Sequence, residues 1–306
     1  MDFKVIEKQV LSSDGVHYLK GKLYIPNADI KGYVQVVHGM TEHIGRYNDF
    51  MQKMAGFGYL TFAFDNLGHG KTANSLDELG YIAKKNGYKL LLNDVLVFYN
   101  SVKAEYGDYS YTLMGHSMGS FIVRCAAIKT LLPNKLIIMG TSGKNKLAGL
   151  GILFVKILKI FKGDRHVSKL LDKVAVGGYN KKFISENNRR SWLTTDKEVW
   201  AKYEKDELCN RRFSLSAMQD LITLNKISNS NKWYKKIDKN MPILLISGSD
   251  DPVGKFEKGV KEVYNKLIKN GKKAQIKLYK KARHEILSEP NVKDKVVEDI
   301  LKFIEE

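Results

Sequence analysis

Cysteine and long apolar segments are scarce in this chain of 306 residues. The 2 cysteines, Cys125 and Cys209, belong neither to a C-x-x-C pair nor to a cluster with histidine. This scarcity excludes a disulfide scaffold and a structural zinc site. The longest uncharged apolar segment, from Leu147 to Val155, falls well short of the roughly 20 residues that cross a bilayer. That segment cannot span a membrane.

Acidic residues are in the minority: 33 Asp and Glu stand against 51 Lys and Arg, a formal net charge of +18. The lysines are scattered along the chain and are not interleaved with aromatic residues. We interpret them as a solubilising surface and expect no nucleic-acid partner.

The first residues mix acids and bases and lack the uninterrupted apolar stretch of a signal peptide. A cytoplasmic location is therefore expected.

Internal repeats and low-complexity tracts are absent as well, and an apolar content of 43% is typical of a globular protein. The sequence predicts an N-terminal β-hairpin, followed by short β-rich runs that alternate with helical periodicity. The expected strands are 3–11, 18–25, 33–37, 59–64, 109–114, 135–139, 242–246 and 274–279, and the expected helices are 47–57, 88–104, 118–131, 256–268 and 292–303. This alternation indicates an α/β protein whose mostly parallel sheet has helices on both faces.

The alternation stops near Gly140 and resumes at Pro242. The residues between them show no convincing strand, carry helical periodicity over 192–203 and 214–224, and contain all 3 tryptophans. We therefore expect a core formed by residues 1–140 and 241–306, with residues 141–240 inserted as a helical cap over the sheet.

The clearest motif is Gly115-His116-Ser117-Met118-Gly119, a G-x-S-x-G between an expected strand and an expected helix. Its glycines allow a turn too tight for neighbouring side chains, which holds the serine above the sheet edge. The helix that begins at Met118 directs free N–H groups at the same point. Ser117 is therefore the predicted nucleophile.

A serine hydroxyl needs a base, and the base needs a carboxylate to orient it. His284 is the only histidine after His166, and it directly follows the last expected strand. Asp250 and Asp251 follow the strand that ends at Ile246. We favour Asp251, which precedes Pro252, while Asp250 would be a turn residue. The order Ser117, Asp251, His284 is that of α/β-hydrolases.

An oxyanion needs two N–H donors, which we expect from Met118 and, after an early strand, from Met40 in His38-Gly39-Met40. His38 and His69 end strands beside glycines and are predicted to pin loops by hydrogen bonds, because no second ligand stands at metal spacing. No phosphate-binding loop motif is present. We expect neither a metal nor a cofactor.

Together these motifs resemble the monoacylglycerol lipase and lysophospholipase branch of the α/β-hydrolases, which is related to the S33 serine aminopeptidases. The matching segments are 38–43 with Arg46 and Tyr47, then 65–70, 115–119, 248–251 and 282–287. The resemblance implies a cofactor-free serine hydrolase of single-chain lipid esters. By resemblance its residues are Ser117 as nucleophile, Asp251 as acid, His284 as base, and Met40 and Met118 as oxyanion donors.

Three alternatives to a lipid-ester hydrolase are considered. A peptidase or thioesterase with a cap, or an acyltransferase that excludes water, would use the same triad. The third is a catalytically inactive ligand-binding protein. The last is disfavoured because the triad is complete.

Residues 147–161 are rich in apolar side chains, and Lys156, Lys159 and Lys162 follow at three-residue intervals. We expect such a helix to dock at a membrane interface, with a lipid ester as substrate. The alternative is that its apolar face packs on the interior of the cap while the lysines keep it soluble.

Overall fold

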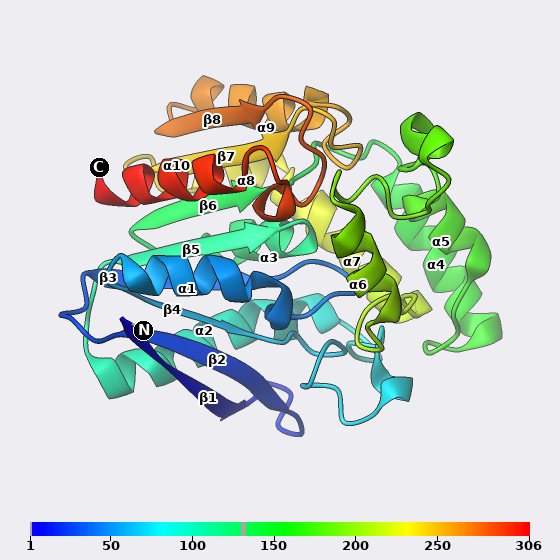
Figure 1. Cartoon of the computed structure of the whole chain (residues 1–306). Helices are drawn as coiled ribbons and strands as arrows, with labels where there is room; N and C mark the ends of the chain where they lie inside the picture. The colour runs from blue at the N-terminus through cyan, green and yellow to red at the C-terminus, as the bar shows by residue number, and fades with distance from the viewer. Residues whose placement is uncertain (1, 130–132) are drawn as a thin grey trace.

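The computed structural model describes residues 2–129 and 133–306. Eight strands form one sheet in the order β1-β2-β4-β3-β5-β6-β7-β8 (Figure 1). The pairs β1–β2 and β2–β4 are antiparallel, and all the other neighbouring pairs are parallel. The strands are β1 (Phe3–Leu11), β2 (Tyr18–Pro26), β3 (Gly32–Val37), β4 (Tyr59–Phe64), β5 (Tyr111–His116), β6 (Lys135–Met139), β7 (Ile243–Gly248) and β8 (Ala274–Tyr279).

Helices cover both faces of the sheet, as the alternation predicts. On one face, α2 (Gly87–Tyr106), α3 (Met118–Ala126) and α9 (Lys258–Lys269) contribute side chains to the larger hydrophobic cluster. The helices α1 (Asn48–Gly56) and α10 (Lys293–Glu305) lie on the other face (Figure 1). Their buried side chains belong to a second hydrophobic cluster. Short 3₁₀ turns lie at Ile44–Tyr47, Leu76–Glu78, Lys181–Glu186 and Ile286–Ser288.

Between β6 and β7 the chain is helical, and we call residues 141–240 the inserted segment. Its helices are α4 (Ala148–Lys162), α5 (Lys169–Val176), α6 (Lys197–Lys205), α7 (Leu215–Ser228) and α8 (Asn231–Lys236). Helices α4 and α5 project away from the sheet (Figure 1). By contrast, Leu224 of α7 and Trp233 of α8 are fully buried in the larger cluster. The end of the inserted segment is therefore anchored on the core.

The N-terminal hairpin shows how local chemistry sets the strand ends. Asp14 Oδ1 accepts the N–H groups of Val16 and His17 at 2.8 and 2.9 Å. Gly15 has φ +74°, a conformation that favours glycine. The turn between β1 and β2 is therefore specified by these two residues.

Two expected helices have different ends in the structure. The helix expected over 118–131 ends at Ala126, and the Lys129 N–H reaches back three residues to the Ala126 carbonyl at 3.0 Å. Residues 130 and 131 of that prediction lie outside the described residues. The periodicity over 192–203 becomes α6 only from Lys197, because Asp196 caps it by accepting the Glu198 N–H at 2.8 Å.

No helix in the described ranges is both long and apolar enough to cross a membrane.

Candidate active site

Ser117 lies in a strained turn between β5 and α3. Its φ of 54° and ψ of −118° are unusual for a residue with a side chain. The flanking glycines make this turn possible: a Cβ on Gly115 would lie 2.3 Å from the Gly119 carbonyl oxygen. A Cβ on Gly119 would lie 2.0 Å from the Val37 carbonyl oxygen. The sequence thus holds Ser117 at the carboxyl end of the central strands.

His284 and Asp251 form a buried hydrogen-bonded pair in which Nδ1 and Oδ2 are 3.0 Å apart. Burial alone would raise the pKa of Asp251, but the nearby His284 ring and the Val253 N–H lower it. An ionised Asp251 accepts a hydrogen bond from the Nδ1–H of His284, and Nε2 then carries a lone pair. Activation of a serine requires such a lone pair, because Nε2 must take the hydroxyl proton.

His284 and Ser117 approach the same end of β6. The Ser117 N–H donates to the Met139 carbonyl at 3.0 Å, and a Cβ on Gly140 would lie 3.1 Å from His284 Cε1. Within the described residues, neither Ser117 Oγ nor His284 Nε2 makes a hydrogen bond to another protein atom. Both atoms are therefore free to act on a bound molecule.

Asp250 has a different role from its neighbour. Its Oδ1 accepts a hydrogen bond from the Lys182 ammonium group at 2.7 Å, and both side chains are partly exposed. Its backbone N–H donates to the Ala282 carbonyl at 2.9 Å. The carboxylate that contacts His284 is thus Asp251, the residue favoured from the sequence.

The loop after β3 brings the expected oxyanion donors to the serine. A Cβ on Gly39 would lie 3.0 Å from Ser117 Cβ, so this loop packs directly against Ser117. In the part of the chain that the structure describes, the N–H groups of Met40 and Met118 donate to no protein acceptor. Two unused N–H groups beside a serine can receive the oxygen of a tetrahedral intermediate.

Glu42 is a site residue whose role sequence reasoning missed. It is 5% exposed, accepts the Gly39 N–H at 2.5 Å and the Tyr47 hydroxyl at 2.8 Å, and lies 3.4 Å from His116 Nδ1. His116 Nε2 contacts the His284 carbonyl oxygen at 3.2 Å. The Glu42 carboxylate therefore connects the loop after β3, through His116, to the backbone of His284.

The charges in this network support one another. Burial by itself would lower the pKa of His116, but the hydrogen bond and charge of Glu42 raise it. Burial would raise the pKa of Glu42, whereas His116 and Arg46 lower it. Each group thus favours the charged form of the other, and the pair lies beneath the loop after β3. The sequence signal that could have indicated a role for Glu42 is its position in the H-G-x-x-E-H motif of residues 38–43.

The loop that carries His284 is hydrogen bonded to the inserted segment. The His284 N–H donates to the Trp192 carbonyl at 3.4 Å, and the Glu285 N–H donates to the Leu193 carbonyl at 2.7 Å. The Trp192 and His284 ring centroids are 5.2 Å apart. The Arg283 guanidinium donates to the Ser191 carbonyl at 2.5 Å. The inserted segment thus contacts the base through both backbone and side chains.

A second connection passes through Arg46. Its guanidinium forms ion pairs with Glu42 at 3.3 Å and Glu285 at 2.5 Å, and it lies 4.6 Å from the centre of the Tyr203 ring of α6. The chain positions 42, 203 and 285 are therefore held together by one cation. No local sequence pattern indicates this contact.

His38 and His69 pin loops, as expected. His38 Nε2 accepts the Asn66 N–H at 2.9 Å, and His69 Nδ1 donates to the Leu67 carbonyl at 3.0 Å. Burial lowers the pKa of His38 to about 3 and that of His69 to about 4. Both rings are therefore neutral near pH 7.

One cluster, His43, Asp206 and Cys209, has the residue types of a metal site. The Gly45 N–H donates to His43 Nδ1 at 3.1 Å, so the ring proton lies on Nε2, which donates to Asp206 at 2.7 Å. Burial also raises the pKa of the Cys209 thiol and disfavours the thiolate. These donors do not fit a metal ion, and the cluster instead links the loop after β3 to the inserted segment.

Comparisons with known proteins find relatives over most of the chain. The chain is 24% identical to a monoglyceride lipase homolog of Monkeypox virus over 94% of this chain and 93% of that protein. It is 25% identical to a monoacylglycerol lipase of Mycolicibacterium smegmatis over 92% and 91% of the two chains. A thermostable carboxyl esterase of Bacillus coagulans superposes with a TM-score of 0.91 at 29% identity over 98% of each chain.

The likeness to known structures shows the α/β-hydrolase fold that the motifs predict. The family resemblance noted from the sequence is confirmed by a match over most of the chain. Because residues 28–291 match the serine aminopeptidase S33 family, the chain is a member of that family of hydrolases.

Proposed function

We propose that the protein cleaves carboxylic esters of single-chain lipids, of the monoacylglycerol or lysophospholipid type, through an acyl-enzyme on Ser117. The observation that carries this proposal is the buried Asp251–His284 pair at the strand end where Ser117 stands. The similarity to monoglyceride and monoacylglycerol lipases supports a glyceride substrate.

In the proposed mechanism, Ser117 Oγ attacks the ester carbonyl carbon while His284 Nε2 takes the hydroxyl proton. Asp251 stabilises the imidazolium that forms, and the N–H groups of Met40 and Met118 hold the negative oxygen. The intermediate collapses, the C–O bond to the alcohol breaks, and the alcohol leaves with the proton from His284. Water then attacks the acyl-enzyme by the same proton route, which releases the fatty acid and free Ser117.

The proposal is tested by comparing kcat/KM over 1- and 2-monoacylglycerols, lysophospholipids and aminoacyl p-nitroanilides. We expect a lipid ester to be the best substrate, with transfer to added glycerol a minor product. The best rates on aminoacyl anilides would instead make the protein a peptidase. A dominant glycerol-transfer product would make it an acyltransferase.

We also propose that the inserted segment acts as a cap that docks on a lipid surface through α4. Several large apolar side chains of this helix are exposed: Leu150 (67%), Leu153 (55%), Phe154 (45%), Ile157 (45%), Ile160 (79%) and Phe161 (77%). Lys156 and Lys162 are exposed on the same helix. Apolar side chains can enter the headgroup region while lysines contact anionic lipid.

Lys159 does not have the role expected for it, which was contact with lipid headgroups. Its ammonium group donates to the Lys84 carbonyl at 3.0 Å and to the Gln219 amide oxygen at 3.3 Å. Burial lowers its pKa. Lys159 therefore holds α4 against neighbouring parts of the protein, and the docking proposal rests on Lys156 and Lys162.

Replacing Lys156 and Lys162 together with glutamine is expected to weaken binding to anionic vesicles by roughly 30-fold. This estimate takes about 1 kcal/mol for each lysine near an anionic surface. Vesicle sedimentation would measure it, alongside turnover of vesicle-embedded monoacylglycerol and of a soluble short-chain ester.

The matched control replaces Lys258 and Lys269, two exposed lysines of α9, with glutamine. This pair removes the same charge but should leave vesicle binding nearly unchanged. Equal losses in the two double variants would show that net charge, rather than α4, binds the vesicle.

A further inference from the structure

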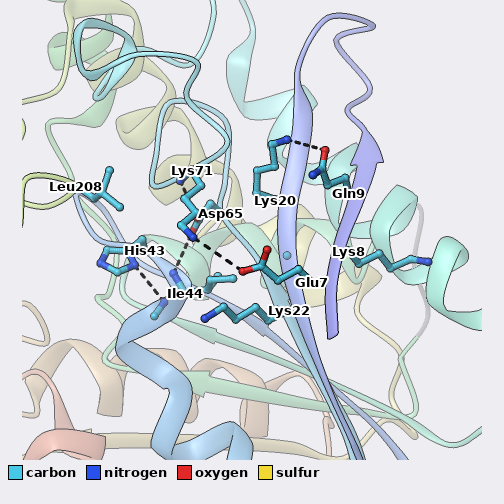
Figure 2. Close-up of a pocket in the computed structure, with 12 residues that line it drawn as sticks. Glu7, Lys8, Gln9, Lys20, Lys22, His43, Ile44, Asp65, Lys71 and Leu208 are labelled. Atoms are coloured by element: carbon cyan, nitrogen blue, oxygen red, sulfur yellow. Dashed lines mark hydrogen bonds and ion pairs between the residues drawn. The ribbon is translucent and has the colours of Figure 1, made fainter. Parts of the chain in front are cut away.

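A hollow of about 290 Å³ lies beside the N-terminal hairpin (Figure 2). Residues of β1 and β2 form one wall, and residues 43–45 after β3 form another. Asp65 and Lys71 close it from the loop after β4, and Leu208 closes it from the inserted segment. Neither Ser117, Asp251 nor His284 lines this space.

Strand register gathers charge on the side of the hairpin that faces the hollow. Glu7 pairs with Lys22 and Gln9 pairs with Lys20, so these four side chains share one face of β1 and β2. Lys8 projects from the other face and forms an ion pair with Glu105 at 2.6 Å (Figure 2). Lys8 therefore does not contribute to the charge of the hollow, although its stem lies nearby.

The lysines that remain are poorly neutralised. Lys20 is bonded to the uncharged Gln9 amide at 2.6 Å, and Lys22 forms no ion pair within residues 2–129 and 133–306. Lys71 has only a 4.0 Å contact with Glu7, and both side chains are largely exposed. Such an exposed pair contributes little stability.

Asp65 is the other acidic residue in the lining, and its carboxylate forms no ion pair with these three lysines. Its two carboxylate oxygens accept the N–H groups of Ile44 and Lys71, each at 2.8 Å. Burial raises its pKa. The lining of the hollow thus includes three lysines without a close carboxylate partner, Lys20, Lys22 and Lys71, with Glu7 as its exposed carboxylate.

We propose that this hollow binds a phosphate group, either free or as part of a lipid headgroup. Lysine is a compact point charge that binds phosphate without needing planar geometry, and a dianion matches several ammonium groups better than a single carboxylate does. In Figure 2, Glu7 lies between Lys71 and Lys22. A bound phosphate replaces Glu7 as the partner of Lys71. The proposal is independent of ester hydrolysis.

Variants of Lys22 and Glu7, which pair across β1 and β2, should change the affinity for phosphate in opposite directions. Lys22→Gln is expected to weaken binding of inorganic phosphate and of glycerol 3-phosphate by roughly fivefold, because one attractive charge is lost. Glu7→Gln should tighten binding by a similar factor, because the competing carboxylate is removed. Titration calorimetry at low salt measures both. Loss of the fold would not produce opposite signs.

The matched control is Lys4→Gln, which removes a lysine from β1 outside the residues that line the hollow. Phosphate affinity should not change in this variant. The absence of saturable phosphate binding by the wild-type protein would overturn the proposal. Equal weakening by Lys4→Gln and Lys22→Gln would overturn it too, since that result indicates attraction to net charge alone.

Vesicles distinguish the two sources of phosphate. If the group belongs to a lipid, Lys22→Gln should weaken binding to phosphatidylglycerol vesicles, and glycerol 3-phosphate should compete. If the ligand is free phosphate, vesicle binding should be unchanged while phosphate binding falls. Both measurements can use the protein carrying Ser117→Ala, so a failed hydrolysis proposal leaves this test intact.

Discussion

Replacing Ser117 with alanine is expected to lower turnover of a monoacylglycerol by about 10⁴-fold or more, the scale seen when a triad nucleophile is removed. Without the hydroxyl no acyl-enzyme can form. Labelling by a fluorophosphonate, in which the serine oxygen bonds to phosphorus and fluoride leaves, should also disappear. Rates and intact-protein mass spectrometry measure the two effects.

The fold should survive this change. Ser117 Oγ makes no hydrogen bond within the described residues, and alanine can occupy the same backbone conformation at a cost close to that of serine. A melting temperature within a few degrees of wild type is the control. Full activity with labelling at another residue would show that the nucleophile lies elsewhere.

Changing Asp251 to asparagine is the second large effect expected, a loss in kcat of about 10⁴-fold. Asparagine can donate a hydrogen bond to His284 Nδ1 and thereby favour the tautomer that carries its proton on Nε2. That tautomer cannot accept the serine proton. Steady-state kinetics on a soluble ester would measure the loss without interference from vesicle binding.

Asp250→Asn is the matched control for this variant. Asp250 forms a partly exposed ion pair with Lys182, and such pairs contribute about 0–1 kcal/mol. Its kcat should remain within a few-fold of wild type. If the two aspartate variants show reversed effects, Asp250 is the acid.

The parts of the fold that could be predicted are those written in local sequence. The strand expected at 135–139 is β6, and that expected at 59–64 is β4, because each is a short apolar run bounded by turn residues. The Ser117 turn was predictable since only glycine fits at 115 and 119. Local rules sufficed wherever a residue's neighbours in the chain determine its conformation.

Contacts between distant residues could not be predicted in this way. Arg46 and Glu285 are 239 positions apart, and only the folded sheet brings their side chains together. The Glu42 carboxylate was visible as part of a motif, but its contact with His116 depends on how β3 and β5 pair. The start of α6 at Lys197 depended on whether Asp196 would act as its cap.

The hydrogen bonds from residues 283–285 to the carbonyl groups of 191–194 constrain how this protein can be re-engineered. Exchange of the entire inserted segment with that of a relative would remove the acceptors that hold the His284 loop. Such a chimera is expected to lose the alignment of His284 even if its new helices pack well on the core. Grafts confined to α4 and α5 keep those acceptors, so these two helices can be exchanged without altering the hydrogen bonds of the His284 loop.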